Sequence, residues 1–156
     1  MYRISYFLTS HLILFMTKVH FSSKSILWET PQAFYDSLNE KYHFNTDVCA
    51  VKENAKCRQF YTPQQDGLKQ SWQGRVWMNP PYGREIGKWV EKAYTESLHG
   101  CLVVSLLPAR TDTLWYHCYI NNQQNVTVRF LKGRLKFGNS QYPAPIPSML
   151  VIFGII

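Results

Sequence analysis

Cysteine pairs, metal-ligand spacings and long apolar runs are all missing from this chain of 156 residues. Its cysteines, Cys49, Cys57, Cys101 and Cys118, form no C-x-x-C pair, and no histidine stands at zinc-ligand spacing from them. We therefore expect reduced thiols in a reducing cytosol and no metal site. No apolar run has membrane-spanning length and internal repeats are absent, which argues against a membrane protein and a repeat protein.

Acidic residues are also few. Ten Asp and Glu against seventeen Lys and Arg leave a net charge of +7. A basic chain favours a polyanionic partner such as nucleic acid, although simple solubility explains the same charge equally well. Hydrophobic residues make up 46% of the chain and aromatic residues 15%, which suits one compact domain with a real core and is cramped for two.

The first fifteen residues, MYRISYFLTSHLILF, resemble a signal peptide because an arginine precedes an apolar stretch. Ser, Thr and His interrupt that stretch, no small-x-small cleavage site follows it, and Met16 offers an alternative start. We expect an N-terminal extension over residues 1–21 and one folded domain over residues 22–156. A signal peptide is the less favoured alternative.

The apolar pattern predicts helices that alternate with strands. Helices are expected at residues 32–41, 86–98 and 111–120, and strands at 43–50, 75–78, 101–108, 126–131 and 148–156. Thr30 and Thr111 are expected to cap the first and third helices, and the polar segment 51–69 to form a surface loop with at most local structure. This order is typical of an α/β fold with a doubly wound, mostly parallel sheet. Such sheets bind ligands at the carboxyl ends of their strands.

The stretch VWMNPPYG, residues 76–83, is an unusual end for a strand, because its two prolines remove two backbone donors. Asn79 offers a side-chain carbonyl and Pro80 a main-chain carbonyl, while Tyr82 offers a flat face for stacking. Asn79-Pro80-Pro81-Tyr82 resembles the signature of amino-group methyltransferases that use S-adenosylmethionine. Two acceptors on the two N–H groups of an exocyclic amine would free its nitrogen lone pair for methyl transfer. A rigid turn in which Tyr82 merely packs is the structural alternative.

Further blocks along the chain extend this resemblance: WETPQAFYDSL, FNTDVCA, YTPQQDGL, LLPARTDTLWYH, RFLKGRLKFG and APIPSMLVIFG. Together they resemble the phage and prophage DNA N-6-adenine methyltransferase family over about residues 28–154. The resemblance implies a Rossmann-like methyltransferase fold, S-adenosylmethionine as cofactor, site-specific methylation of adenine N6, and double-stranded DNA as partner. The alternatives are methylation of RNA or of a protein glutamine, and a catalytically silent nucleic-acid-binding module.

The resemblance also implies roles for single residues. Asn79, Pro80, Pro81 and Tyr82 are the implied catalytic residues. The implied cofactor-binding residues are Trp28, Thr30, Pro31, Asp47, Cys49, Ala50 and Asp66, with the Asp47 carboxylate facing the cofactor ammonium and Asp66 facing its adenine amine. DVCA lacks the glycine that related enzymes place after this strand. Asp47 as a capping or turn carboxylate, Asp66 as an Asx-turn residue and Trp28 as a core residue are the structural alternatives.

DNA contacts are expected from three basic side chains near strand ends, namely Arg110, Arg134 and Lys136. Ordinary solvated charges are the alternative. The chain has little room for a separate target-recognition domain. The loop 132–148 is therefore the best candidate for sequence specificity, unless partner subunits supply it.

Overall fold

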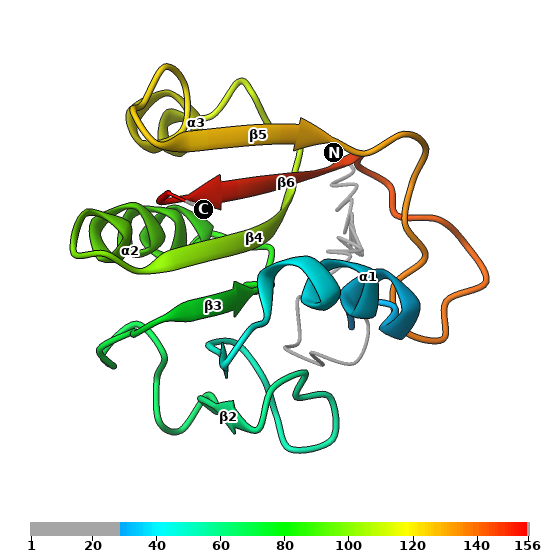
Figure 1. Ribbon diagram of the computed structural model, residues 1–156. Helices are drawn as coiled ribbons and strands as arrows, with labels where there is room; N and C mark the ends of the chain where they lie inside the picture. The colour runs from blue at the N-terminus through cyan, green and yellow to red at the C-terminus, as the bar shows by residue number, and fades with distance from the viewer. Residues whose placement is uncertain (1–28, 156) are drawn as a thin grey trace, which may run out of the picture.

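The computed structural model describes residues 29–155, which contain three helices and six strands (Figure 1). The helices are α1 (Gln32–Tyr42), α2 (Ile86–Leu98) and α3 (Leu114–Tyr119). The strands are β1 (Thr46–Asp47), β2 (Gln59–Phe60), β3 (Arg75–Met78), β4 (Leu102–Pro108), β5 (Val126–Phe130) and β6 (Ser148–Phe153). The expected extension over residues 1–21 and Trp28 lie outside the described residues. No helix within 29–155 is long and apolar enough to cross a membrane.

The six strands form one mixed sheet in the order β2-β1-β3-β4-β6-β5. Strands β2, β1, β3 and β4 pair in parallel, whereas β6 is antiparallel to both β4 and β5. Strands β1 to β5 therefore all end at one edge of the sheet, which we call the carboxyl edge, and β6 begins there. The predicted α/β class is confirmed. The winding is less regular than expected, because the segments that join β1 to β2 and β2 to β3 contain no helix.

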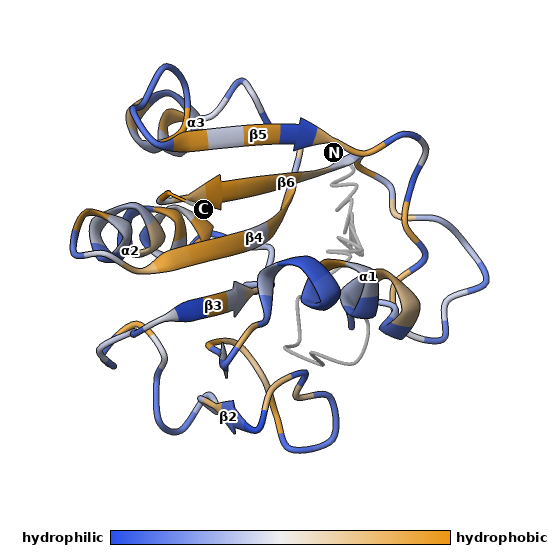
Figure 2. Cartoon of the chain, viewed as in Figure 1, coloured by the Kyte–Doolittle hydropathy of each residue, from blue (hydrophilic) through white to orange (hydrophobic). Residues whose placement is uncertain are grey.

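The core lies on both faces of the sheet, because alternate residues of each central strand point to opposite faces. On one face, Met78, Val103 and Val151 pack in a cluster with Trp89 and Val90 of α2. On the other face, a second cluster contains Trp77, Leu106 and Ile152 of the sheet, Tyr35 and Tyr42 of α1, and Phe137 from the loop between β5 and β6. Every residue of β4 and β6 is buried, as the continuous apolar runs predicted, and Figure 2 shows hydrophobic colour along both strands.

Two strands differ from the predicted pattern. Strand β1 is only two residues long rather than spanning 43–50, because the Asp47 carboxylate accepts hydrogen bonds from the main-chain N–H groups of Cys49 and Lys56 and bends the chain there. Strand β2 lies inside the segment expected to be a loop. It is held by pairing with β1, and Tyr61 N donates to Asp47 O at 2.9 Å just beyond it.

Both predicted helix caps are wrong. Residue Pro31 precedes α1 with no side-chain capping hydrogen bond, and the Thr30 hydroxyl contacts Asn79 instead. Helix α3 begins later than expected, with Thr113 rather than Thr111 at its N-cap. The Thr113 hydroxyl donates to Arg110 O at 2.7 Å, so it closes the turn before the helix rather than capping it.

Candidate active site at the carboxyl edge of the sheet

The strand order changes direction beside β1. After β1 the chain moves outward to β2, then returns to the other side of β1 to form β3. In open α/β sheets, a ligand crevice forms outside the carboxyl ends of the strands at such a switch point. Asp47 ends β1 and Asn79 follows β3, and Val48 N donates to Trp77 O at 3.2 Å across the two strands. The two unusual stretches of the sequence therefore lie next to each other.

Pro80 ends the pairing between β3 and β4. Leu102 N donates to Gly74 O at 2.9 Å, and the register runs to Met78 opposite Ser105. One more step of this parallel ladder would place the N–H of residue 80 opposite the Leu106 carbonyl, and proline has no N–H. The Tyr82 hydroxyl donates to that carbonyl instead, at 3.2 Å. Burial raises the pKa of the Tyr82 hydroxyl above its ordinary value, so the group stays a donor.

The Tyr82 ring also contacts Phe137 from the loop that follows β5. The two ring centroids are 6.1 Å apart and the ring planes are 84° apart, an edge-to-face contact. Phe137 is only 2% exposed. Sequence reasoning missed Phe137, although its place in the block RFLKGRLKFG was a usable signal.

The Asn79 side chain is held from the segment before α1. Its Nδ2 donates a hydrogen bond of 3.1 Å to the Oγ1 atom of Thr30, which is buried. Two residues that were assigned to different roles, one catalytic and one cofactor-binding, are therefore in direct contact.

Asp47 is a buried carboxylate at the end of β1. Its Oδ1 atom accepts from Cys49 N at 3.2 Å and its Oδ2 atom from Lys56 N at 3.1 Å. Burial raises the pKa of Asp47 from 3.8 to about 6, although the two main-chain donors and the charge of Lys56 oppose this shift. The side chain is thus mostly ionised at neutral pH. The turn role considered as an alternative is present, and each oxygen keeps a further lone pair.

Lys56 is a second buried charge at this edge. Its Nζ atom lies 3.0 Å from Glu29 Oε1 and 3.0 Å from Gln32 Oε1, and its side chain is only 6% exposed. The Glu29 carbonyl in turn accepts from Gly138 N at 2.8 Å. The segment before α1 is therefore tied both to the loop after β1 and to the loop after β5. No sequence pattern indicated Lys56.

Asp66 lies in a tight turn next to the end of β1. Its Oδ1 atom accepts from Leu68 N at 3.2 Å, which is the Asx-turn alternative, and its Oδ2 atom pairs with Lys69 Nζ at 3.2 Å. The adjacent Gly67 is packed so closely that a Cβ atom there would lie 2.2 Å from the Val48 carbonyl oxygen. A glycine thus approaches the end of β1 closely, although it comes from a different segment than expected.

Comparison with known proteins identifies the family to which this site belongs. Residues 18–152 match the model of the family described as DNA N-6-adenine-methyltransferase (Dam). This chain belongs to the DNA N-6-adenine-methyltransferase family. The predicted family and the predicted activity, methylation of adenine N6 in DNA, are therefore confirmed.

Two phage proteins illustrate the relationship, and both are named DNA N-6-adenine-methyltransferase. The protein of Haemophilus phage HP1 (strain HP1c1) is 34% identical over 136 residues, which cover 81% of this chain and 78% of that protein. The protein of Escherichia phage T1 is 36% identical over 93 residues, which cover 58% of this chain and 39% of that protein.

The three basic residues expected to contact DNA are exposed and belong to segments at the carboxyl edge of this family member. Arg110 follows β4, and its Nε and Nη2 atoms lie 3.2 and 3.3 Å from the two carboxylate oxygens of Asp112. Arg134 and Lys136 lie in the loop 131–147, which joins β5 to β6. The charge of Arg110 is thus partly offset by Asp112.

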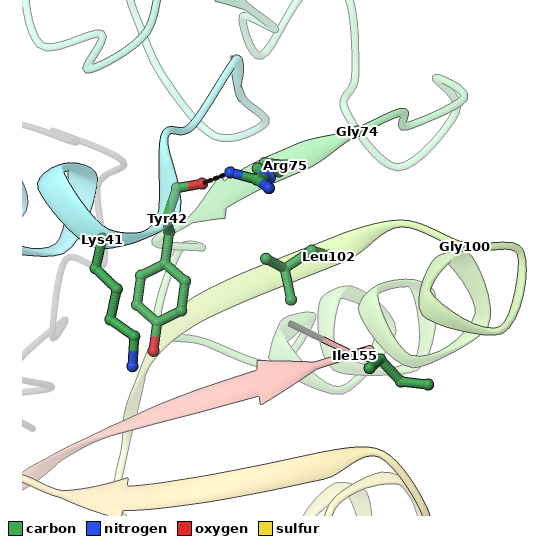
Figure 3. Close-up of a pocket in the computed structure, with 7 residues that line it drawn as sticks. All are labelled: Lys41, Tyr42, Gly74, Arg75, Gly100, Leu102 and Ile155. Atoms are coloured by element: carbon green, nitrogen blue, oxygen red, sulfur yellow. Dashed lines mark hydrogen bonds between the residues drawn. The ribbon is translucent and has the colours of Figure 1, made fainter.

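A cavity of about 240 Å³ lies at the opposite edge of the sheet, where β3 and β4 begin (Figure 3). Arg75 Nη1 donates to Tyr42 O at 3.2 Å in its wall. Its lining residues are Lys41, Tyr42, Gly74, Arg75, Gly100, Leu102 and Ile155. None of them follows a strand at the carboxyl edge, so this cavity is separate from the candidate active site.

Proposed function

We propose that this member of the DNA N-6-adenine-methyltransferase family uses S-adenosylmethionine to methylate adenine at specific sites in double-stranded DNA. Residues Asn79, Pro80, Pro81 and Tyr82 form the catalytic platform. The main support for the proposal is the geometry at the end of β3. There Pro80 ends the pairing with β4, and Thr30 holds the Asn79 side chain at the switch point. This geometry offers a fixed amide and a fixed main-chain carbonyl beside the end of β1.

The platform acts by hydrogen bonding to the acceptor amine. The Asn79 side-chain carbonyl and the Pro80 main-chain carbonyl accept one N–H each from adenine N6, which draws the nitrogen lone pair out of conjugation with the ring. When bound, S-adenosylmethionine supplies a methyl group on a cationic sulfur, and the carbon–sulfur electrons stay with the sulfur as the new nitrogen–carbon bond forms. The methylated nitrogen then releases its extra proton to solvent. A general base with a tuned pKa is not required.

Tyr82 supplies the stacking surface for the adenine. Base–aromatic stacking is worth about 1–3 kcal/mol, which offsets part of the few kcal/mol that extrusion of a base from the duplex costs. The orientation of the ring is held at both ends, by the hydroxyl contact with Leu106 and the edge contact with Phe137. We assign Phe137 the role of supporting Tyr82.

The residues near the end of β1 fit the amino-acid part of the cofactor. A buried carboxylate with lone pairs to spare, Asp47, is the group that would hold an ammonium ion. Cys49 and Ala50 follow Asp47 closely in the chain. Thr30 and Pro31 lie at the same edge of the sheet, and Trp28 is two residues before Thr30 in the sequence. Asp66 is the proposed acceptor for the adenine amine of the cofactor, through the lone pairs that its turn and its ion pair with Lys69 leave.

The sheet supports a Rossmann-like methyltransferase fold for this domain. Helix α1 covers one face and helices α2 and α3 the other, and the switch point lies between β1 and β3. The two missing helices between β1 and β3 make this a shortened version of the doubly wound pattern. Residues 22–156 form the methyltransferase domain on this proposal.

Double-stranded DNA approaches the carboxyl edge. Arg110, Arg134 and Lys136 would bind phosphates there, and the loop 131–147 would read the sequence. The loop also carries Tyr142, whose side chain is 78% exposed. An exposed aromatic ring in the same loop as basic side chains is a combination that can stack on bases and bind the nucleic-acid backbone.

The test is transfer of tritium-labelled methyl from S-adenosylmethionine to duplex DNA, followed by digestion to nucleosides. Label should appear in N6-methyladenine for the wild type and be abolished in Asn79→Ala, with cofactor affinity retained. Asn121→Ala, which changes an asparagine between α3 and β5 at the opposite edge, is the matched control and should stay active. Label found only in RNA or in protein would contradict the proposal.

A further inference from the structure

We infer that the Thr30 hydroxyl is a positioning group for the catalytic amide of Asn79. The inference rests on the proposed function and goes beyond it, since Thr30 was expected to be a helix cap and a cofactor-binding residue rather than a partner of Asn79. Asn79 Nδ2 donates to Thr30 Oγ1 at 3.1 Å across 49 residues of sequence. Thr30 is 3% exposed, so this hydrogen bond is shielded from competing water.

The hydroxyl is not needed by the helix that follows. Helix α1 begins after Pro31 and has no side-chain capping hydrogen bond, and its first turn closes through Tyr35 N and Pro31 O at 3.1 Å. A buried hydroxyl must hydrogen-bond to offset its lost hydration. For Thr30 that bond is made with Asn79, so a residue with the sequence signature of a cap serves the end of β3.

The direction of this bond matters for the chemistry. An asparagine amide has one acceptor end and one donor end. With Nδ2 on Thr30, the carbonyl end of Asn79 is directed away from Thr30, and this is the end that the adenine amine requires. An inverted amide would place N–H groups against the N–H groups of adenine. The Thr30 hydroxyl, which accepts from Nδ2, therefore anchors the amide by its donor end.

Thr30 is suited to this role because its own segment is anchored twice. The adjacent Glu29 accepts from Gly138 N through its carbonyl, at 2.8 Å, and pairs with Lys56 through its carboxylate, at 3.0 Å. These contacts tie the segment to the loop after β5 and to the loop after β1. Asn79 is thus positioned relative to the loops assigned to DNA and to cofactor.

The first test compares Thr30→Val, which removes the hydroxyl at nearly constant shape, with Thr30→Ser, which keeps it. Thr30→Val should lower kcat for DNA methylation by about tenfold, the value of one hydrogen bond, and this loss should exceed any change in the KM for S-adenosylmethionine. Thr30→Ser should restore most of kcat. If Thr30→Val does not fold, Thr30→Ala provides the same loss of the hydroxyl.

The second test does not depend on activity. The side-chain amide of Asn79 gives a ¹⁵N–¹H signal pair that Asn79→Ala identifies by its loss. In cofactor-free protein this pair should move in Thr30→Val and stay near its wild-type position in Thr30→Ser.

Three outcomes would overturn the inference: an unchanged kcat with a raised KM for S-adenosylmethionine, an equal loss of activity and thermal stability in the valine and serine variants, or an amide signal indifferent to Thr30→Val. Failure of the proposed function would give a different result. The wild type itself would then leave DNA adenine unmethylated, while the Asn79 amide signals could still move in Thr30→Val.

Discussion

The buried carboxylate at the end of β1 gives a sharp prediction about stability and pH. Burial raises the pKa of Asp47 in the folded chain from 3.8 to about 6, which corresponds to about 3 kcal/mol at about 1.4 kcal/mol per pKa unit. Because the folded pKa is the higher one, the folded state binds more protons than the unfolded state between pH 4 and 6. The contribution of Asp47 to stability therefore falls as pH rises through this window.

The assay is urea unfolding of wild type and Asp47→Asn at a series of pH values. The free energy of unfolding of Asp47→Asn minus that of the wild type should rise by about 3 kcal/mol from pH 3.5 to pH 7, because only the wild type must ionise a buried group. Titration of the other groups contributes equally to both proteins and therefore cancels in this difference.

Asp112 provides a control of opposite sign. Its hydrogen bonds with Arg110 lower its pKa below the ordinary value, so its contribution to stability is lost as pH falls. The free energy of unfolding of Asp112→Asn minus that of the wild type should fall as pH rises. A flat or falling difference for Asp47→Asn would refute the assignment of burial as the dominant effect at Asp47.

Three further predictions concern the site. Tyr82→Phe leaves the Leu106 carbonyl without its hydroxyl donor, so it should lower the free energy of urea unfolding by about 1–3 kcal/mol. Affinity for S-adenosylmethionine, measured by isothermal titration calorimetry, should fall as pH drops below about 6, because protonated Asp47 cannot pair with an ammonium group. The double variant Arg134→Gln with Lys136→Gln should weaken DNA binding in a fluorescence anisotropy titration. It should also reduce the slope of log affinity against log salt by about 2, one for each lost phosphate contact.

Matched controls exist for two of these predictions. Tyr142→Phe removes a hydroxyl from an exposed ring and should not change the free energy of unfolding. Lys41→Gln removes a positive charge at the opposite edge of the sheet and should leave the salt dependence of DNA binding unchanged. For the cofactor, an affinity that stays constant from pH 5 to pH 8 would contradict the role given to Asp47.

The elements of this fold that could be predicted from the sequence are those with a clear apolar pattern. The runs that became β3, β4 and β6 were found from sequence, because a strand buried on both faces needs a continuous apolar segment. The end of β1 was misjudged, because Asp47 bends the chain with its own side chain. Strand β2 was missed because two residues held by a neighbouring strand leave no periodic signal.

The candidate site also has a part that could be predicted from the sequence and a part that could not. Asn79 and Tyr82 belong to a contiguous motif whose chemistry can be argued from residue types alone. The contacts that hold them come from elsewhere in the chain: Thr30, Leu106 and Phe137. A single sequence carries no record of such long-range pairs. For this reason Thr30 was read as a helix cap, and the contact of Phe137 was not foreseen.

On the proposed function, Asn79 and its neighbours in the chain catalyse methylation of adenine in DNA. The most direct measurement is methylation-sensitive sequencing of DNA from cells without adenine methylation of their own that express either the wild type or Asn79→Ala. We expect N6-methyladenine at defined sites with the wild type and none with the variant. Equal methylation with both proteins, or wild-type DNA without N6-methyladenine, would contradict it.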